Sequence, residues 1–158
     1  MTETTVPRYV AVIGATVTDA DADAAAERVG ALLAEAGAVV VTGGRDGIAA
    51  AASRGAAEAG GLTLGILPGR DRSEANPWVR VAVPTGLGEL RNALVVMDAD
   101  AVIAFPGAYG TLIELGFALH TGRSIVVVGD WPLAAGASVR RAGSAEEAVA
   151  YALSAANS

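Results

Sequence analysis

Short apolar runs alternate along the chain with longer segments in which alanine and polar residues repeat at helical spacing. The apolar runs predict strands at Tyr9–Ile13, Ala38–Val41, Leu62–Leu67, Val79–Val83, Ala101–Phe105 and Ile125–Val128. The longer segments predict helices at Asp19–Ala36, Gly47–Ala59, Gly88–Met97, Thr111–Thr121 and Ser144–Ser154. Strands that are apolar on nearly every residue are buried on both faces, as in parallel sheets with βαβ crossovers. The pattern therefore predicts an α/β fold with a doubly wound, mostly parallel sheet in a Rossmann-like three-layer sandwich.

The length of 158 residues corresponds to a single domain, which we expect to span residues 1–158. Apolar residues make up 53% of the chain and charged residues 18%, a balance that excludes general disorder. None of the apolar runs approaches the ~20 residues that a membrane span needs. The net charge of −6 disfavours nucleic acid and anionic membranes as partners. The amino-terminal residues show no secretory leader, which favours a cytoplasmic location.

The chain has no cysteine, a single histidine at position 120, and arginine as its only basic residue type. Disulfides and zinc–thiolate sites are therefore excluded, and no metal site is predicted. Without lysine the chain cannot form an internal Schiff base, so it is not a pyridoxal phosphate-dependent lysine decarboxylase. The candidate chemistry rests on carboxylates, arginine, hydroxyls and main-chain amides.

Three glycine-bearing turns follow predicted strands, at residues 14–16, 43–47 and 106–111. Each turn precedes a predicted helix or lies near its start, where free N–H groups and the positive end of the helix dipole attract anions. The alternative is that these glycines only make tight turns between strand and helix. The first turn lacks the G-x-G-x-x-G pattern of ordinary dinucleotide binding. The candidate phosphate- or nucleotide-binding residues are Gly14, Gly43, Gly44, Arg45, Gly47, Gly107, Ala108, Tyr109, Gly110 and Thr111.

The segment Pro106–Glu114 resembles the P-G-G-x-G-T-x-x-E signature of the LONELY GUY (LOG) family, whose members were often labelled lysine decarboxylases. Upstream, Arg91 and the sequence Asp98-Ala99-Asp100 resemble the family's arginine-bearing helix and the strand that follows it. Thr42–Ile48 resembles the family's glycine-rich segment. The resemblance covers most of residues 9–130.

The resemblance implies a nucleoside 5′-monophosphate ligand and a phosphoribohydrolase that cleaves an N-glycosidic bond to give base and ribose 5-phosphate. The catalytic residues that it implies are Arg91 and Glu114. A carboxylate can stabilise an oxocarbenium-like state and orient water, and an arginine can bind phosphate or sugar oxygens. The alternative for Glu114 is a first-turn acid that only interacts with its own helix dipole.

The chain also departs from the LOG pattern. Ala108 replaces a motif glycine, Asn92 stands where the family usually has lysine, and Thr42 replaces the first glycine of the upstream triplet. These departures resemble a short bacterial branch that is also similar to molybdenum cofactor carrier proteins. The alternative function is therefore a non-catalytic carrier or sensor of a phosphorylated ligand.

Two further residues are possible substrate contacts. Asn92 follows the candidate arginine, and Trp131 follows the last main strand at the predicted ligand edge of the sheet. Trp131 could stack on a base or pack in the core, and Trp78 is expected in the core. No cofactor is required by this interpretation, although a phosphorylated ligand could co-purify. The resemblance implies a homodimer or a higher homo-oligomer, with alanine-rich helix faces as candidate interfaces.

Overall fold

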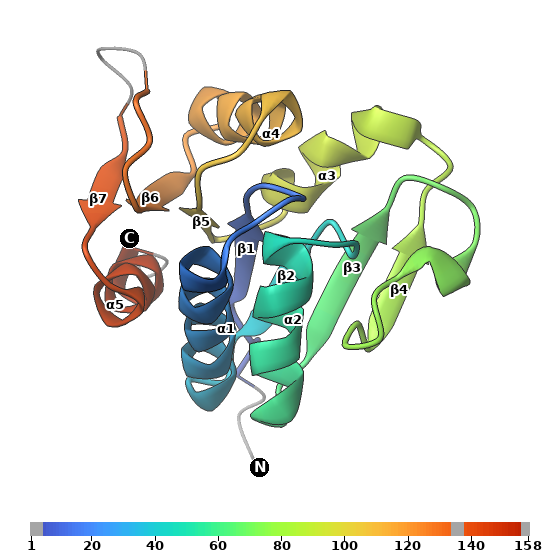
Figure 1. The fold of residues 1–158 in the computed structure, drawn as a ribbon, viewed down its shortest axis with the longest axis horizontal. Helices are drawn as coiled ribbons and strands as arrows, with labels where there is room; N and C mark the ends of the chain where they lie inside the picture. The colour runs from blue at the N-terminus through green and yellow to red at the C-terminus, as the bar shows by residue number, and fades with distance from the viewer. Residues whose placement is uncertain (1–4, 134–137, 156–158) are drawn as a thin grey trace.

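The structure is a computed structural model that describes residues 5–133 and 138–155 of the chain. Residues 1–4 lie outside the described residues, and they are part of the segment from which the absence of a secretory leader is predicted. The described part forms three layers, with a central sheet between two groups of helices (Figure 1).

Seven strands form the sheet, and every neighbouring pair is parallel. Their order across the sheet is β4-β3-β2-β1-β5-β6-β7. In chain order they are β1 (Tyr9–Ile13), β2 (Val39–Thr42), β3 (Thr63–Leu67), β4 (Val81–Pro84), β5 (Ala101–Ala104), β6 (Ser124–Val128) and β7 (Arg140–Ala142). The predicted α/β fold is confirmed, and the sheet is wholly parallel.

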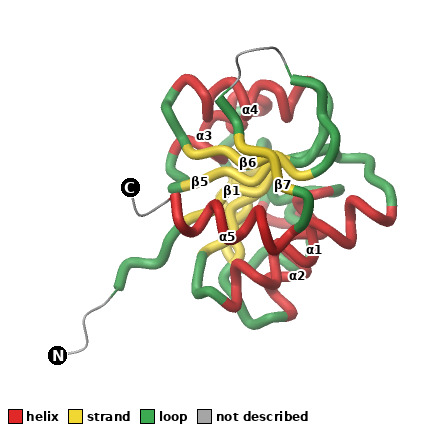
Figure 2. The backbone as a smooth tube through the Cα atoms, turned by 90° about the vertical axis from the view of Figure 1, so that its left-hand side faces the viewer, coloured by secondary structure: helices red, strands yellow, loops and turns green. Residues whose placement is uncertain are grey.

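The helices cover both faces of the sheet. Figure 2 shows the sheet between α3 and α4 on one face and α1, α2 and α5 on the other. The bounds are α1 (Ala20–Glu35), α2 (Ile48–Glu58), α3 (Asn92–Met97), α4 (Tyr109–His120) and α5 (Ala145–Ala155), with short 3₁₀ turns η1 (Arg72–Glu74) and η2 (Gly88–Arg91).

Two sequence predictions need correction. The helix predicted over Gly88–Met97 is divided into η2 and the six-residue α3. The strand β7 was not predicted, because two of its three residues are exposed arginines and only Ala142 is buried. An edge strand needs no continuous apolar run, because it has a neighbouring strand on one side only.

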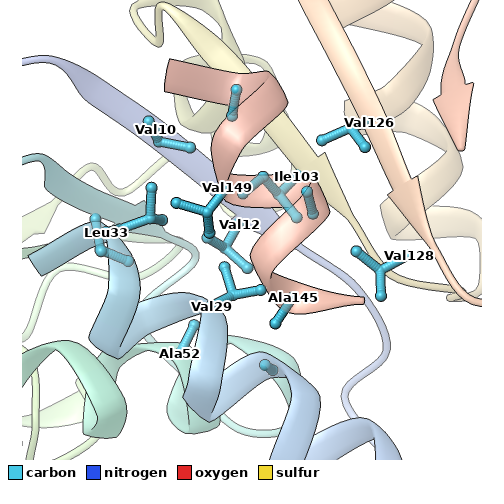
Figure 3. Close-up of a cluster of buried hydrophobic side chains, with 14 of the residues drawn as sticks. Val10, Val12, Val29, Leu33, Ala52, Ile103, Val126, Val128, Ala145 and Val149 are labelled. Atoms are coloured by element: carbon cyan, nitrogen blue, oxygen red, sulfur yellow. The ribbon is translucent and has the colours of Figure 1, made fainter. Parts of the chain in front are cut away.

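The two faces of the sheet carry separate hydrophobic cores. Val10 and Val12 of β1 point to the core under α1, α2 and α5, together with Ile103 of β5 (Figure 3). Ala11 and Ile13 belong to the core under α3 and α4. This division follows from the two-residue period of a strand, which sends successive side chains to opposite faces.

The order of the strands places a crevice beside β1. The chain runs outward from β1 through β2, β3 and β4, and returns through α3 to β5 on the other side of β1. Ligands of open α/β sheets bind outside the carboxyl ends of the strands at such a reversal of strand order. The fold therefore directs attention to the turns that follow β1, β2 and β5.

Helices α1 and α2 pack at very short range through glycine. A Cβ atom on Gly30 of α1 would overlap the carbonyl oxygen of Ala52, and one on Gly55 of α2 would overlap that of Glu27. The small faces of these two helices are thus used within the domain. By contrast, a Cβ on Gly116 of α4 would meet no atom within 4 Å.

The pair Gly30 and Gly116 gives a matched stability test. We expect Gly30→Ala to destabilise the protein by about 1–3 kcal/mol, because the added methyl group would force the two helices apart. In the dissociated protomer, Gly116→Ala should be neutral or stabilising by up to about 1 kcal/mol, because alanine is the better helix former. Denaturant unfolding of the two variants measures the difference, and equal effects of both substitutions would contradict the packing described.

Candidate functional site

A pocket of about 250 Å³ lies at the carboxyl-terminal edge of the sheet. This volume lies just below the usual range of small-molecule sites, about 300–1,000 Å³. The residues that matter most for its chemistry are Gly14, Thr16, Gly43, Arg45, Arg91 and Glu114. The pocket therefore combines residues from the first two glycine turns with the two predicted catalytic residues.

Main-chain contacts hold the turns together at this edge. The Ala15 N–H donates to the carbonyl of Pro106 at 3.2 Å, and the Ile48 N–H donates to the carbonyl of Ala15 at 3.0 Å. Gly47 has a φ of +71°, and a Cβ there would overlap the carbonyl oxygen of Ala15. The turns after β1, β2 and β5 thus meet backbone to backbone, which only glycine permits at position 47.

The start of α2 faces the pocket. Its N-cap residue, Gly47, provides no side-chain hydrogen bond, and Ala49 in the first turn lines the pocket. The first N–H groups of a helix have no partner within the helix and carry the positive end of its dipole. Together with the Arg45 side chain, this helix end makes one side of the pocket suited to an anion.

Arg91 fixes the far side of the pocket. Its Nη1 donates to the carbonyls of Gly43 and Ile66, each at 2.7 Å. A Cβ on Gly43 would overlap this nitrogen, so glycine is needed for the arginine to reach the main chain. Arg91 Nε is buried and has no partner in residues 5–133 and 138–155. Burial lowers the pKa of the guanidinium, and the nearby Glu114 opposes that shift.

Glu114 lies at the same pocket and is 8% exposed. Burial raises the pKa of its carboxyl group to about 7, and the nearby Arg91 acts in the opposite direction. Glu89 of η2 also lines the pocket and raises the pKa of Glu114 further. A carboxyl group that changes protonation near neutral pH, beside a guanidinium, is typical of functional sites.

Asn76 is a site residue that the sequence analysis missed. It is buried, its main-chain N–H donates to Gly44 at 2.8 Å, and its Nδ2 donates to the carbonyl of Arg45 at 2.8 Å. Glu74, nearby in chain, pairs with the Arg45 guanidinium at 3.6 Å. The segment before β4 therefore clamps the glycine turn after β2. No sequence pattern marks this role, because the bonds reach main-chain atoms 31 positions away.

Several predicted site residues do not line this pocket. In the described part of the chain its lining omits Gly44 and Gly47, which shape the turn, and the whole turn Gly107–Thr111. Asn92 is buried and donates to Glu89 Oε2 at 3.2 Å. Trp131 is 7% exposed and belongs to the core under α3 and α4. Of the two predicted substrate contacts, therefore, neither faces the pocket in this structure.

The turn after β5 stands beside the pocket instead of within its lining. Gly107 packs against Thr111, whose hydroxyl a Cβ on Gly107 would overlap. Ala108 is the N-cap residue of α4 and has no side-chain capping bond, and Tyr109 is 84% exposed. Gly110 lies next to the Asn92 amide, 3.7 Å from where a Cβ would stand. The expected anion position between residues 43–47 and 107–111 remains a prediction.

Two features are absent from residues 5–133 and 138–155. No group of three or more histidine, cysteine, aspartate or glutamate side chains in this part of the chain could hold a metal ion. Likewise, no helix within it has the length and apolar character needed to cross a bilayer.

Comparison with known protein families assigns the chain to one family. Residues 7–157 match the SLOG cluster4 family, and the protein belongs to it. An uncharacterised protein from Archaeoglobus fulgidus is 38% identical over 116 residues, which are 73% of this chain and 76% of the relative.

Solved structures give a similar result. The molybdenum cofactor binding protein of the phototrophic bacterium Rippkaea orientalis is 33% identical, with a TM-score of 0.88 and coverage of 94% of this chain and 97% of that chain. The molybdenum cofactor carrier protein of Chlamydomonas reinhardtii is 28% identical, with a TM-score of 0.86 and coverage of 97% and 100%. DNA processing protein A of Helicobacter pylori shares the fold alone, at 18% identity over 94% of this chain and 81% of that chain, with a TM-score of 0.71.

The burial of Glu114 predicts a pH dependence of stability. Because its folded pKa of about 7 lies above the ordinary value of 4.5, folding favours the protonated form. The resulting stabilisation is complete below about pH 4.5 and is lost as pH rises through 7. The free energy of unfolding of the wild type should therefore fall by an amount on the order of 3 kcal/mol between pH 5 and 8, and this fall should be absent in Glu114→Gln. The control is Glu35→Gln, which changes an exposed glutamate on α1. Denaturant unfolding at each pH measures the difference, and parallel stability profiles for wild type and Glu114→Gln would contradict this account.

Proposed function

We propose that the protein is a carrier that binds a phosphorylated small molecule, and that its ligand is the molybdenum cofactor, a phosphorylated pterin. The supporting observation is the anion-suited pocket at the start of α2 in a chain that resembles a molybdenum cofactor binding protein over 94% of its length. The proposal takes the ligand as cargo, so no bond needs to be made or broken in this pocket.

The residues present fit the phosphate end of such a ligand. The Ala49 N–H in the first turn of α2, the Thr16 hydroxyl and the Arg45 guanidinium supply donors on one side of the pocket. Protonation of Glu114 near neutral pH reduces repulsion of a bound anion. Arg91 acts by holding the carbonyls of Gly43 and Ile66 in place. The net charge of −6 still disfavours nucleic acid as a partner.

A second candidate function is nucleotide phosphoribohydrolase activity. One specific observation favours it, namely that Glu114 and Arg91 face the same pocket and interact electrostatically. A glutamate with a pKa of about 7 has a suitable pKa for general acid–base work on a glycosidic bond. This function would require the substrate's sugar to lie against Glu114.

A paired binding and turnover experiment separates the two functions. Purified protein is titrated with molybdenum cofactor released anaerobically from a molybdoenzyme, and bound molybdenum is measured after ultrafiltration. We expect Arg45→Gln to weaken binding about 10- to 100-fold, because it removes a charge-assisted hydrogen bond. The matched control is Arg80→Gln, an exposed arginine outside the pocket lining.

Turnover is measured in parallel with nucleoside 5′-monophosphates, by assay of ribose 5-phosphate. Cofactor retention without sugar phosphate release supports the carrier. Release that falls at least about 10²-fold in Glu114→Gln would support the hydrolase instead. If Arg45→Gln and Arg80→Gln bind the cofactor equally, the assignment of the phosphate position is wrong.

We also propose that two copies of the chain associate through the outer face of α3 and α4. Leu112, Ile113 and Phe117 of α4 are 42%, 45% and 39% exposed, and Leu90 and Leu94 lie exposed on the neighbouring η2 and α3. The outward side of α4 carries no charged side chain before His120, because Glu114 is buried. Exposed large apolar side chains gathered on neighbouring elements are typical of a protein interface.

Light scattering coupled to size-exclusion chromatography tests this interface. We expect twice the monomer mass for the wild type and the monomer mass for Phe117→Arg, because a charge at the centre of an apolar contact has no partner there. Val81→Arg places the same charge on the exposed edge of β4 and should leave the mass unchanged. A monomeric wild type at micromolar concentration would contradict the proposal.

A further inference from the structure

A second cavity, of about 220 Å³, adjoins the first on the side of α1 and α2. The two cavities share Thr16, and Gly47 lies at the boundary on the second side. The second cavity is lined chiefly by Thr16, Thr18, Asp23, Gly47, Arg54 and Trp78. Apart from Thr16 and Gly47, these residues have no part in the phosphate pocket described above.

Trp78 forms an aromatic wall whose position is fixed by the main chain. Its N–H donates to Asn76 Oδ1 at 3.1 Å, and its carbonyl accepts from the Thr63 hydroxyl at 2.7 Å. The ring is half-buried, and the Arg54 guanidinium lies 5.7 Å from its centre. The sequence analysis placed Trp78 in the core, but here it lines the cavity.

Arg54 is held in place by two neighbours. Its Nη2 donates to Glu27 across the contact between α1 and α2, and this bond raises the pKa of the guanidinium. Arg54 lines the cavity, and its Nε has no hydrogen-bond partner in the part of the chain that the structure describes. The side chain is therefore oriented with donor capacity left over at the cavity.

Asp23 supplies the complementary acceptor. The Thr18 hydroxyl donates to Asp23 Oδ1 at 2.5 Å, which fixes the carboxylate at the start of α1. Oδ2 has no hydrogen-bond partner among the described residues. Thus a carboxylate, a guanidinium and an indole ring line one cavity.

We infer that this second cavity binds a 2-amino-4-oxopyrimidine heterocycle, the edge shared by pterin and guanine. The amino group and the adjacent ring N–H present two donors that a carboxylate such as Asp23 accepts. The 4-oxo group accepts from a guanidinium, and the flat ring stacks on an indole. A free phosphate suits the cavity less well, because the Asp23 carboxylate would repel it.

The inference rests on the proposed function and deepens it, because a phosphorylated pterin would reach both cavities across Thr16. The phosphate would then lie at the start of α2 and the heterocycle between Trp78 and Asp23. Probes without phosphate keep the two ideas apart. Failure of the heterocycle site would leave cofactor binding through the first pocket intact.

The test is a titration of the full chain with free pterin, guanosine and adenosine, followed by tryptophan fluorescence and calorimetry. We expect pterin and guanosine to bind and adenosine to bind at least about 10-fold more weakly, because adenine lacks the paired donors. Asp23→Asn should weaken pterin binding about 10- to 100-fold. Asp21→Asn makes the same change at an exposed position of the same helix and should bind like the wild type.

Trp78→Leu is a second variant that removes the stacking wall, and it should weaken both ligands about 10-fold without restoring adenosine binding. Thermal unfolding of each variant checks that the fold is retained. The inference is overturned if neither pterin nor guanosine binds the wild type. It is also overturned if folded Asp23→Asn and Asp21→Asn bind pterin equally.

Discussion

The donation from one arginine nitrogen to two main-chain carbonyls is the contact on which the candidate site depends. Arg91 lies at the end of η2, which follows β4 in the chain. Its Nη1 donates to the carbonyls of Gly43, directly after β2, and of Ile66 in β3. Burial removes much of the Arg91 guanidinium from water and lowers its pKa. The nearby Glu114 and Glu89 act in the opposite direction and favour the charged guanidinium. The same burial keeps Glu114 neutral until about pH 7. Loop geometry and pocket electrostatics therefore share one physical origin.

The fold could be predicted from the sequence because its strands are apolar on nearly every residue and its helices have clear boundary signals. Asp19, the predicted helix cap, accepts from the Ala22 N–H at 2.8 Å. β7 could not be predicted, because a three-residue edge strand leaves no periodic signal. For the site, the LOG-like motif located Arg91 and Glu114, which do meet in one pocket.

Other features of the site depend on tertiary contacts that no local pattern encodes. Asn76 acts on main-chain atoms distant in sequence, and Trp78 lines a cavity only because the segment before β4 folds back over α2. Trp131 looked similar to Trp78 in the sequence, since each tryptophan adjoins a proline, yet it is buried in the core. The two tryptophans differ because Trp131 lies on the sheet face under α3 and α4, whereas Trp78 lies beside α2 on the other face. That arrangement follows from the order of the strands.

Both outer strands of the sheet carry residues that discourage further pairing. β4 ends at Pro84, which has no N–H to donate, and β7 carries Arg140 and Arg141, both exposed. A parallel sheet with unprotected edges would be a template for strand addition and aggregation. Here an additional strand docking beside β7 would bring its backbone against two adjacent positive charges. The edge residues thus protect the sheet against aggregation through strand addition.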